Sequence, residues 1–178
     1  FPHLNDVDAE SLYKAANIVK PSYIRVEADE ATYNLHIMLR FELENDLING
    51  KLDFKHLPEA WKERFETFLG IVPPTDTLGV LQDVHWSSGL IGYFATYALG
   101  NLLSVQYYNQ ALKAKPTIQE EITQGKFSTL LGWLQENIYQ HGRKFTAAEL
   151  TKRLTGGAIQ SDDYIAYLRT KYSDIYGL

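Results

Sequence analysis

Reactive side chains are concentrated in one otherwise apolar stretch, residues 79–100, GVLQDVHWSSGLIGYFATYALG. They are an amide, a carboxylate, an imidazole and two phenols: Gln82, Asp83, His85, Tyr93 and Tyr97. If a helix begins near Ser87–Ser88, Tyr93 and Tyr97 are four residues apart and share one of its faces. His85 then lies just before its start, and the three groups can stabilise a developing negative charge. Aromatic residues at helical spacing also fill cores, so both interpretations stay open.

A second candidate is the arginine within Ile24-Arg25-Val26-Glu27-Ala28-Asp29. Arg25 lies between two apolar residues and is followed by two carboxylates. If ion pairs hold it rigid, its forked guanidinium suits a planar carboxylate ligand. The simpler interpretation is a structural salt bridge at the start of a helix, with Asp29 as the helix cap.

The composition excludes several classes of protein. The chain has 178 residues, enough to bury a real core, and a net charge of −5, which argues against a nucleic-acid surface or a basic membrane face. It has no cysteine, and therefore no disulfide or thiolate metal ligand, which fits a cytoplasmic protein. Its apolar runs are shorter than a membrane span needs. The first residues, FPHLNDVDAE, show no initiator Met or signal peptide and read as the middle of a longer chain.

The hydrophobic pattern predicts an all-α fold, a single helical unit over residues 1–178, with one short extended segment near Tyr23–Val26. Turn and capping residues predict where the helices begin and end. The expected helices cover 7–18, 30–48, 57–69, a long span from Ser87–Ser88 to Pro116, 127–141, and segments after the capping boxes Thr117-x-x-Glu120 and Thr146-x-x-Glu149 and after Ser161.

The helix over 30–48 carries the strongest periodicity. Its apolar face is predicted to contain Leu35, Met38, Leu39, Leu43 and Leu47, and its polar face Glu42, Glu44 and Asp46. His36 precedes Arg40 by one helical turn and is interpreted as a core or interface histidine.

Two spaced motifs identify a family. Ile24-Arg25-x-x-Ala28-Asp29, followed fifty residues later by Gly79-x-x-Gln82-Asp83-x-His85-Trp86, resembles the two C-terminal signatures of the Taq-type (thermostable carboxypeptidase 1) zinc carboxypeptidases. The intervening helices, His141-Gly142-Arg143-Lys144 and the closing Tyr167-Leu168 and Lys171-Tyr172 are also similar. The resemblance therefore covers essentially the whole chain.

One part of the family pattern is missing. Those enzymes bind zinc through an H-E-x-x-H helix and a downstream Glu. This chain has five histidines, no two of them four residues apart: His3, His36, His56, His85 and His141. The resemblance therefore implies a C-terminal part whose zinc-binding half lies upstream of Phe1, and a chain that by itself binds no zinc and is inactive.

The resemblance also implies roles for the candidate residues. His85 and Tyr97, with Tyr93 as second choice for the tyrosine, would donate hydrogen bonds to the oxyanion. Arg25 would face the C-terminal end of the substrate. Gln82 and Asp83 would support them, with Asp83 orienting His85 or an arginine; simple hydrogen bonding at a helix start is the alternative for these two.

The function implied by the resemblance is that of a zinc metallocarboxypeptidase. Such an enzyme releases C-terminal amino acids from peptides with a free C-terminus by attack of metal-activated water, and the intact enzyme is expected to be a homodimer with no nucleic-acid or membrane partner. The alternative is a helical interaction module with no metal site or activity of its own, which the missing H-E-x-x-H motif supports.

Overall fold

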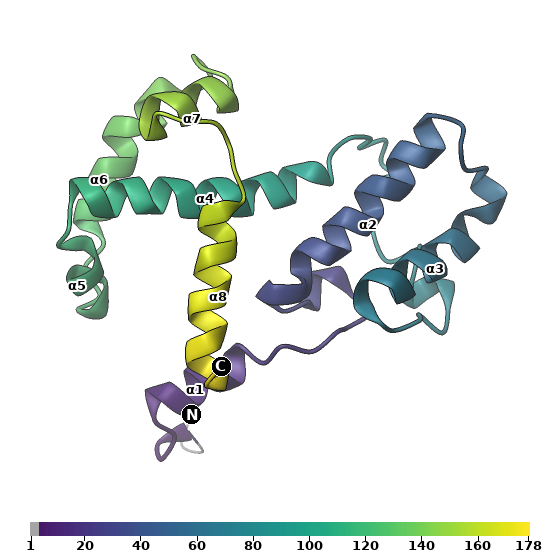
Figure 1. Cartoon of the computed structure of the whole chain (residues 1–178), viewed down its shortest axis with the longest axis horizontal. Coiled ribbons are helices and arrows are strands. Elements are labelled where there is room, and N and C mark those ends of the chain that lie inside the picture. Colours follow the sequence, from purple (N-terminus) through teal and green to yellow (C-terminus); the bar gives the residue numbers. More distant parts are fainter. Residues whose placement is uncertain (1–3) are drawn as a thin grey trace. The chain divides into compact units, whose positions relative to one another are not determined.

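The computed structural model describes residues 4–178, and all the regular elements within them are helical (Figure 1). The predicted all-α class is confirmed, and His3 lies outside the described residues. No helix in this part of the chain is long and apolar enough to cross a membrane. The α-helices are α1 (Ala9–Ala16), α2 (Glu30–Ile48), α3 (Leu57–Leu69), α4 (Ala95–Ala114), α5 (Ile118–Thr123), α6 (Ser128–Asn137), α7 (Ala147–Thr155) and α8 (Asp162–Tyr176).

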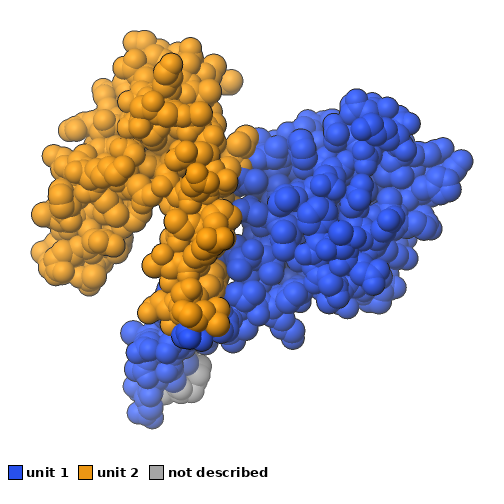
Figure 2. Space-filling model, in the orientation of Figure 1, with its two compact units in different colours: residues 1–98, 175–177 blue, residues 99–174, 178 orange. Residues whose placement is uncertain are grey.

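The chain divides into two compact units, coloured separately in Figure 2. The first comprises Phe1–Ala98 with Ile175–Gly177, and the second Leu99–Asp174 with Leu178. The sequence predicted a single helical unit without a linker; the boundaries between the two compact units fall within helix α4, within helix α8 and before the last residue. That both belong to one catalytic domain stays a prediction.

Helices α2 and α3 form the centre of the first unit, and their ends follow from local sequence. The Asp29 side chain caps α2 by accepting a hydrogen bond from the Thr32 amide. Pro58 lies in the first turn of α3, where its missing N–H costs nothing. Gly70 ends α3 with a φ of 70°, a left-handed conformation that only glycine adopts without strain. Both helices have the predicted bounds.

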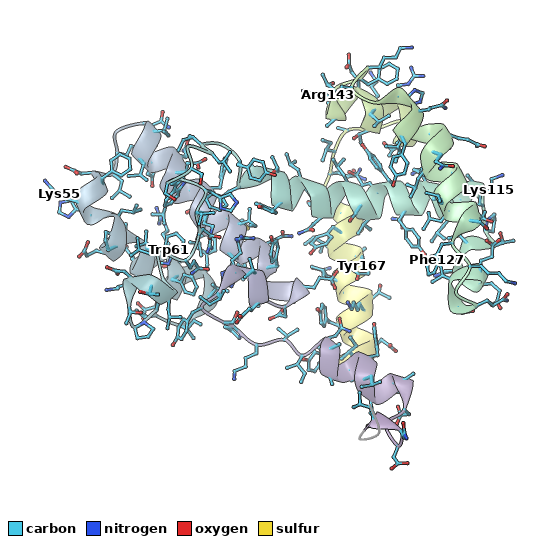
Figure 3. The ribbon with its side chains drawn as sticks, turned by 180° about the vertical axis from the view of Figure 1, so that it is seen from behind. Lys55, Trp61, Lys115, Phe127, Arg143 and Tyr167 are labelled. Atoms are coloured by element: carbon cyan, nitrogen blue, oxygen red, sulfur yellow. The ribbon has the colours of Figure 1, made fainter. Side chains whose placement is uncertain are left out.

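The core of the first unit lies between these two helices. Trp61, labelled in Figure 3, projects from α3, and its neighbour Phe65 is fully buried. The buried apolar residues of this cluster are Leu39 and Leu43 from α2 and Leu57, Trp61, Phe65 and Leu69 from α3. Their spacing of three and four residues places them on one stripe of each helix.

Two residues of α2 lie on the opposite face from the one predicted. Met38 is exposed, and Glu44 is buried. The prediction was wrong because the buried stripe of α2 also includes charged residues, which pair with a loop that is remote in sequence.

The second unit has its own, smaller core. Ala111, Ile118 and Trp133 are buried in it, from α4, α5 and α6 respectively. Thr151 of α7 is fully buried and shares a hydrogen bond of 2.8 Å with the Tyr107 hydroxyl of α4, which ties these two helices together.

Two predicted backbone segments differ in the structure. Helix α4 begins at Ala95 rather than near Ser87–Ser88, and the chain from 79 to 94 makes turns. Near Tyr23–Val26, Ile24 is extended, but Arg25–Glu27 form a short 3-10 helix. In the 79–94 segment Gly89 and Gly92 both have positive φ, which interrupts any helix that the aromatic spacing would favour.

The two predicted capping boxes have different outcomes. Thr146 and Glu149 exchange both hydrogen bonds at the start of α7, so this box is confirmed. Thr117 has helical backbone angles, and its side chain makes no capping hydrogen bond, so the prediction at α5 was wrong.

Replacing Thr146 by Ala should therefore destabilise α7 by about 1 kcal/mol, because an amide at the helix start loses its acceptor. Hydrogen exchange of the α7 amides should accelerate about fivefold, as that energy corresponds to a factor of about five. Thr117→Ala is the matched control and should change α5 by less than about 0.5 kcal/mol. Equal effects of the two substitutions would contradict the assignment.

Candidate functional site

The Asp83 carboxylate joins two buried arginines. Its Oδ1 accepts hydrogen bonds from Nε and Nη2 of Arg25, at 3.2 and 2.8 Å, and its Oδ2 accepts one from Nε of Arg40 at 2.6 Å. Arg25 comes from the 3-10 turn before α2, Arg40 from α2 itself, and Asp83 from the loop before α4. Both oxygens of one carboxylate thus connect three separate parts of the first unit.

Further hydrogen bonds hold the Arg25 turn in place. The Tyr33 hydroxyl accepts from Nη1 of Arg25 at 2.9 Å. The Gln82 side chain accepts from the Arg25 amide at 2.8 Å and donates to the Tyr23 carbonyl at 2.9 Å. It also donates to two carbonyls of its own turn. Gln82 thus hydrogen-bonds both within its own turn and to the Arg25 turn, and its role in substrate binding stays a prediction.

Burial and charge pairing oppose one another in this network. Burial would raise the pKa of Asp83, but its hydrogen bonds and attraction to Arg25 and Arg40 lower it below its usual value. Burial also works against the charge of Arg25, yet its bonds to Asp83 and Tyr33 leave its pKa raised. For Arg40 burial dominates and lowers the pKa to about 10. All three groups are charged at neutral pH, two cations on one anion.

His85 lies beside this network and contacts Tyr97. Its Nε2 is 3.0 Å from the Tyr97 hydroxyl, and its Nδ1 is 3.8 Å from Oδ1 of Asp83. The imidazole is 7% exposed and packs against the buried Phe94 ring, with centroids 4.5 Å apart. Tyr97, half-buried in the first turn of α4, also lies under the Arg25 guanidinium, whose Cζ is 4.9 Å from its ring centroid.

Tyr93 is placed differently from Tyr97. It precedes α4, and 44% of it is exposed. Its ring lies 5.7 Å from the His85 ring and 5.5 Å from that of Tyr97, so the predicted proximity exists without the predicted shared helix face. The partner of His85 in its hydrogen bond is Tyr97 and not Tyr93.

The structure thus brings Arg25, Gln82, Asp83, His85 and Tyr97 into one network, with Tyr93 at its edge. Sequence reasoning missed Tyr33 and Arg40 as members of it. The signal was present in α2, because residues 36, 40 and 44 repeat every four positions beside the buried leucines 39 and 43. A charged residue on the buried stripe of a helix needs a partner from elsewhere in the chain.

His36 is buried, as predicted, but its ring makes no hydrogen bond. Both of its nitrogens lack a partner among the described residues, and the ring packs edge-on against Phe65 at 5.4 Å between centroids. Burial, followed by the positive charges of Arg40 and Arg25, lowers its pKa to about 4. His36 is therefore neutral at neutral pH.

Comparison with known proteins identifies the family. The model of the Carboxypeptidase Taq (M32) metallopeptidase family matches residues 1–172. The chain belongs to the M32 family of metallopeptidases. Thermostable carboxypeptidase 1 of Thermus thermophilus is 44% identical over 177 residues, which are 99% of this chain and 35% of that protein. Carboxypeptidase 1 of Bacillus subtilis is 38% identical over 171 residues, 96% of this chain and 34% of that protein.

A solved M32 structure has the same fold. The crystal structure of the M32 carboxypeptidase from Deinococcus radiodurans R1 superposes with a TM-score of 0.96 at 47% identity, covering all of this chain and 36% of that one. This M32 chain therefore spans about a third of the length of the relatives it matches.

The family description implies a metal cofactor. Within residues 4–178, however, no group of three or more His, Cys, Asp or Glu side chains is placed to hold a metal ion. The side chains of the candidate site that could ligate a metal already have other partners, since Asp83 binds two arginines and His85 contacts Tyr97. The described residues do not fit a metal site.

The buried His36 predicts a specific loss of stability in acid. Its pKa is about 4 in the folded chain and 6.5 ordinarily, so the unfolded chain takes up the proton first as the pH falls. The contribution is fully present above pH 6.5 and should decline by on the order of 3 kcal/mol on going to pH 4. Measuring the free energy of unfolding against pH for the parent and for His36→Gln checks this. If the free energy of unfolding falls equally with pH in the two proteins, His36 makes no such contribution.

Proposed function

We propose that this chain is the C-terminal part of a zinc-dependent metallocarboxypeptidase that releases C-terminal amino acids from peptides with a free C-terminus. The zinc ligands would be side chains outside the described residues, and this chain would bind the substrate and the developing oxyanion. The observation that supports this best is the 3.0 Å contact between His85 and Tyr97 beside a buried arginine. The proposal includes a homodimer, as the resemblance implies, and a cytoplasmic location, which the absence of cysteine fits.

The His85–Tyr97 pair can present hydrogen-bond donors to a carbonyl oxygen. Nε2 of His85 and the Tyr97 hydroxyl share a hydrogen bond of 3.0 Å, in which either can be the donor according to the tautomer of the ring. An N–H on Nε2 and the O–H of Tyr97 are the groups of this pair that would turn to the scissile carbonyl as negative charge develops there, so they would act mainly in the transition state.

Arg25 would bind the terminal carboxylate of the substrate. Three of its five N–H groups are used by Asp83 and Tyr33, which fix the orientation of the guanidinium. One N–H on each of Nη1 and Nη2 remains for a ligand. The cation–π contact brings the Arg25 guanidinium next to Tyr97. Removal of a C-terminal residue would require a carboxylate-binding group beside an oxyanion donor, and this proximity therefore supports the proposal.

Tyr97→Phe and His85→Ala should each lower kcat of the intact protein by roughly 10²–10³-fold with little change in KM, because a donor to the developing charge is lost. Neither residue ligates the metal in this proposal, so the zinc content should not change. Steady-state kinetics and elemental analysis measure these effects.

Tyr93→Phe is the control, since the Tyr93 ring lies beside His85 but Tyr97 makes the hydrogen bond. A loss in Tyr93→Phe with normal activity in Tyr97→Phe would transfer the role to Tyr93. No effect of either would show that the aromatic residues are only packing. If the intact, zinc-supplied protein releases no C-terminal residue at all, the helical interaction module is the better description.

Arg25→Leu should abolish discrimination between a peptide acid and its amide. In the parent this discrimination in kcat/KM should amount to about 2–4 kcal/mol, because only the acid can form the charge-assisted pair. Amidation and substitution remove one and the same interaction, so their effects should not add. Glu27→Gln, an exposed position in the same turn, is the control, since it leaves the guanidinium and its hydrogen-bond partners in place and should keep the discrimination. Unchanged discrimination in Arg25→Leu would exclude the role.

A further inference from the structure

Glu44 of α2 is a buried carboxylate outside the Asp83 network, 6% exposed. Its Oε2 accepts a hydrogen bond from Nε1 of Trp86 at 2.7 Å, and its Oε1 accepts one from the Gly92 amide at 2.8 Å. The two donors stand at the two ends of the segment 86–92. One side chain, using both of its oxygens, therefore closes this segment onto α2.

The segment itself has few other ties. Residues 87–91 are exposed, and their amide hydrogen bonds are turns with the chain just before them, such as Ser88 to the Val84 carbonyl and Leu90 to the His85 carbonyl. In the part of the chain that the structure describes, the hydrogen bonds that leave segment 86–92 for another element go to Glu44. Exposed turns of this kind are the parts of a fold that open most easily.

The path of this segment determines how His85 meets Tyr97. His85 directly precedes it, and Tyr97 follows it in the first turn of α4. Between them, Phe94 is 2% exposed and packs against both the His85 ring and, edge-on at 5.7 Å, the Trp86 ring. Trp86 in turn packs edge-on against Trp61 of α3. A shift of Trp86 or of Gly92 would therefore move Phe94 and Tyr97 relative to His85.

We propose that Glu44 is a positioning residue, which holds segment 86–92 so that the Tyr97 hydroxyl stays within hydrogen-bond distance of His85. It touches neither of these groups and acts through Trp86 and Gly92. The geometric part of this inference stands on the contacts alone, and its effect on turnover rests on the proposed function.

A carboxylate is suited to this position because it accepts two hydrogen bonds and donates none. A glutamine of the same shape offers one oxygen and one NH₂ group, so either the indole N–H or the Gly92 N–H would face another donor. A buried donor without an acceptor is unfavourable, and the segment would move to relieve it. Glu44→Gln thus tests the contact with almost no change in volume.

The experiment compares Glu44→Gln with Glu42→Gln in the intact protein. Glu42 is on the same helix and pairs with Arg64 at 3.4 Å on the surface, so its substitution changes the charge equally without touching the segment. The first measurement is the NMR signal of the Trp86 indole N–H, assigned by its absence in Trp86→Phe, together with the nuclear Overhauser effect between the His85 and Tyr97 rings. The second is kcat and KM on a peptide with a free C-terminus.

We expect Glu44→Gln to shift the Trp86 signal, weaken the His85–Tyr97 effect and lower kcat by about 10–100-fold with KM little changed, as displacement of reactive groups does. Glu42→Gln should match the parent in all three. Should Glu44→Gln fail to fold, Trp86→Phe removes one of the two hydrogen bonds and should give, in part, the same weakening of the His85–Tyr97 nuclear Overhauser effect and the same loss of kcat. Where Glu44→Gln folds, the double variant with Trp86→Phe should lose less than the sum of the two single losses.

An unchanged Trp86 signal and an unchanged kcat in Glu44→Gln would overturn the proposal. So would an equal loss in Glu42→Gln, because a general effect of charge would then explain both. If the parent hydrolyses no peptide, the proposed function fails, but the two NMR measurements still decide whether Glu44 fixes the His85–Tyr97 geometry.

Discussion

The Asp83 carboxylate, held between Arg25 and Arg40, is the interaction on which the first unit depends. Arg40 is fully buried, and Arg25 and Asp83 are nearly so. Charges in this environment need opposite charges and hydrogen bonds close by, and removal of one partner of a buried ion pair typically costs about 3–5 kcal/mol. The network therefore fixes the loop of Asp83, the turn of Arg25 and helix α2 in one arrangement, which is the arrangement that His85 and Tyr97 require.

Helix α2 acts as the support for this arrangement. Arg40 contacts Asp83, and Glu44, one helical turn later, contacts Trp86 and Gly92. Two charged side chains of opposite sign on one buried stripe thus bind consecutive parts of a loop that has no regular secondary structure. Leu39 and Leu43, each next to one of these charged residues, pack against α3, so the position of the loop is coupled to the hydrophobic core.

The same network sets the electrostatics of the site. Two arginines pair with one aspartate, which leaves an excess positive charge close to Tyr97. His36, on the same helix as Arg40, stays neutral at neutral pH. Positive charge near a developing oxyanion or a substrate carboxylate is favourable, and burial strengthens it by excluding water. The cost appears at His36, whose ring nitrogens make no hydrogen bond within residues 4–178 and whose pKa is lowered by burial and then by the two neighbouring cations.

Local sequence by itself determined the all-α class, the bounds of α2 and α3 and the capping box at Thr146, because helix periodicity, Asp29, Pro58, Gly70 and the Thr–Glu pair act within one turn of the chain. The two motifs of the sequence also contained part of the candidate network, namely Arg25, Gln82, Asp83 and His85. Only the tertiary structure decided their geometry. The features that it decided include the start of α4 at Ala95 and the choice of Tyr97, twelve residues from His85, for the hydrogen bond to it. The inclusion of Arg40 and Glu44 depends on contacts across more than forty residues. Helix periodicity shows that a charged residue lies on a buried stripe. Its partner comes from another part of the chain, so only the fold shows why the charge is tolerated there.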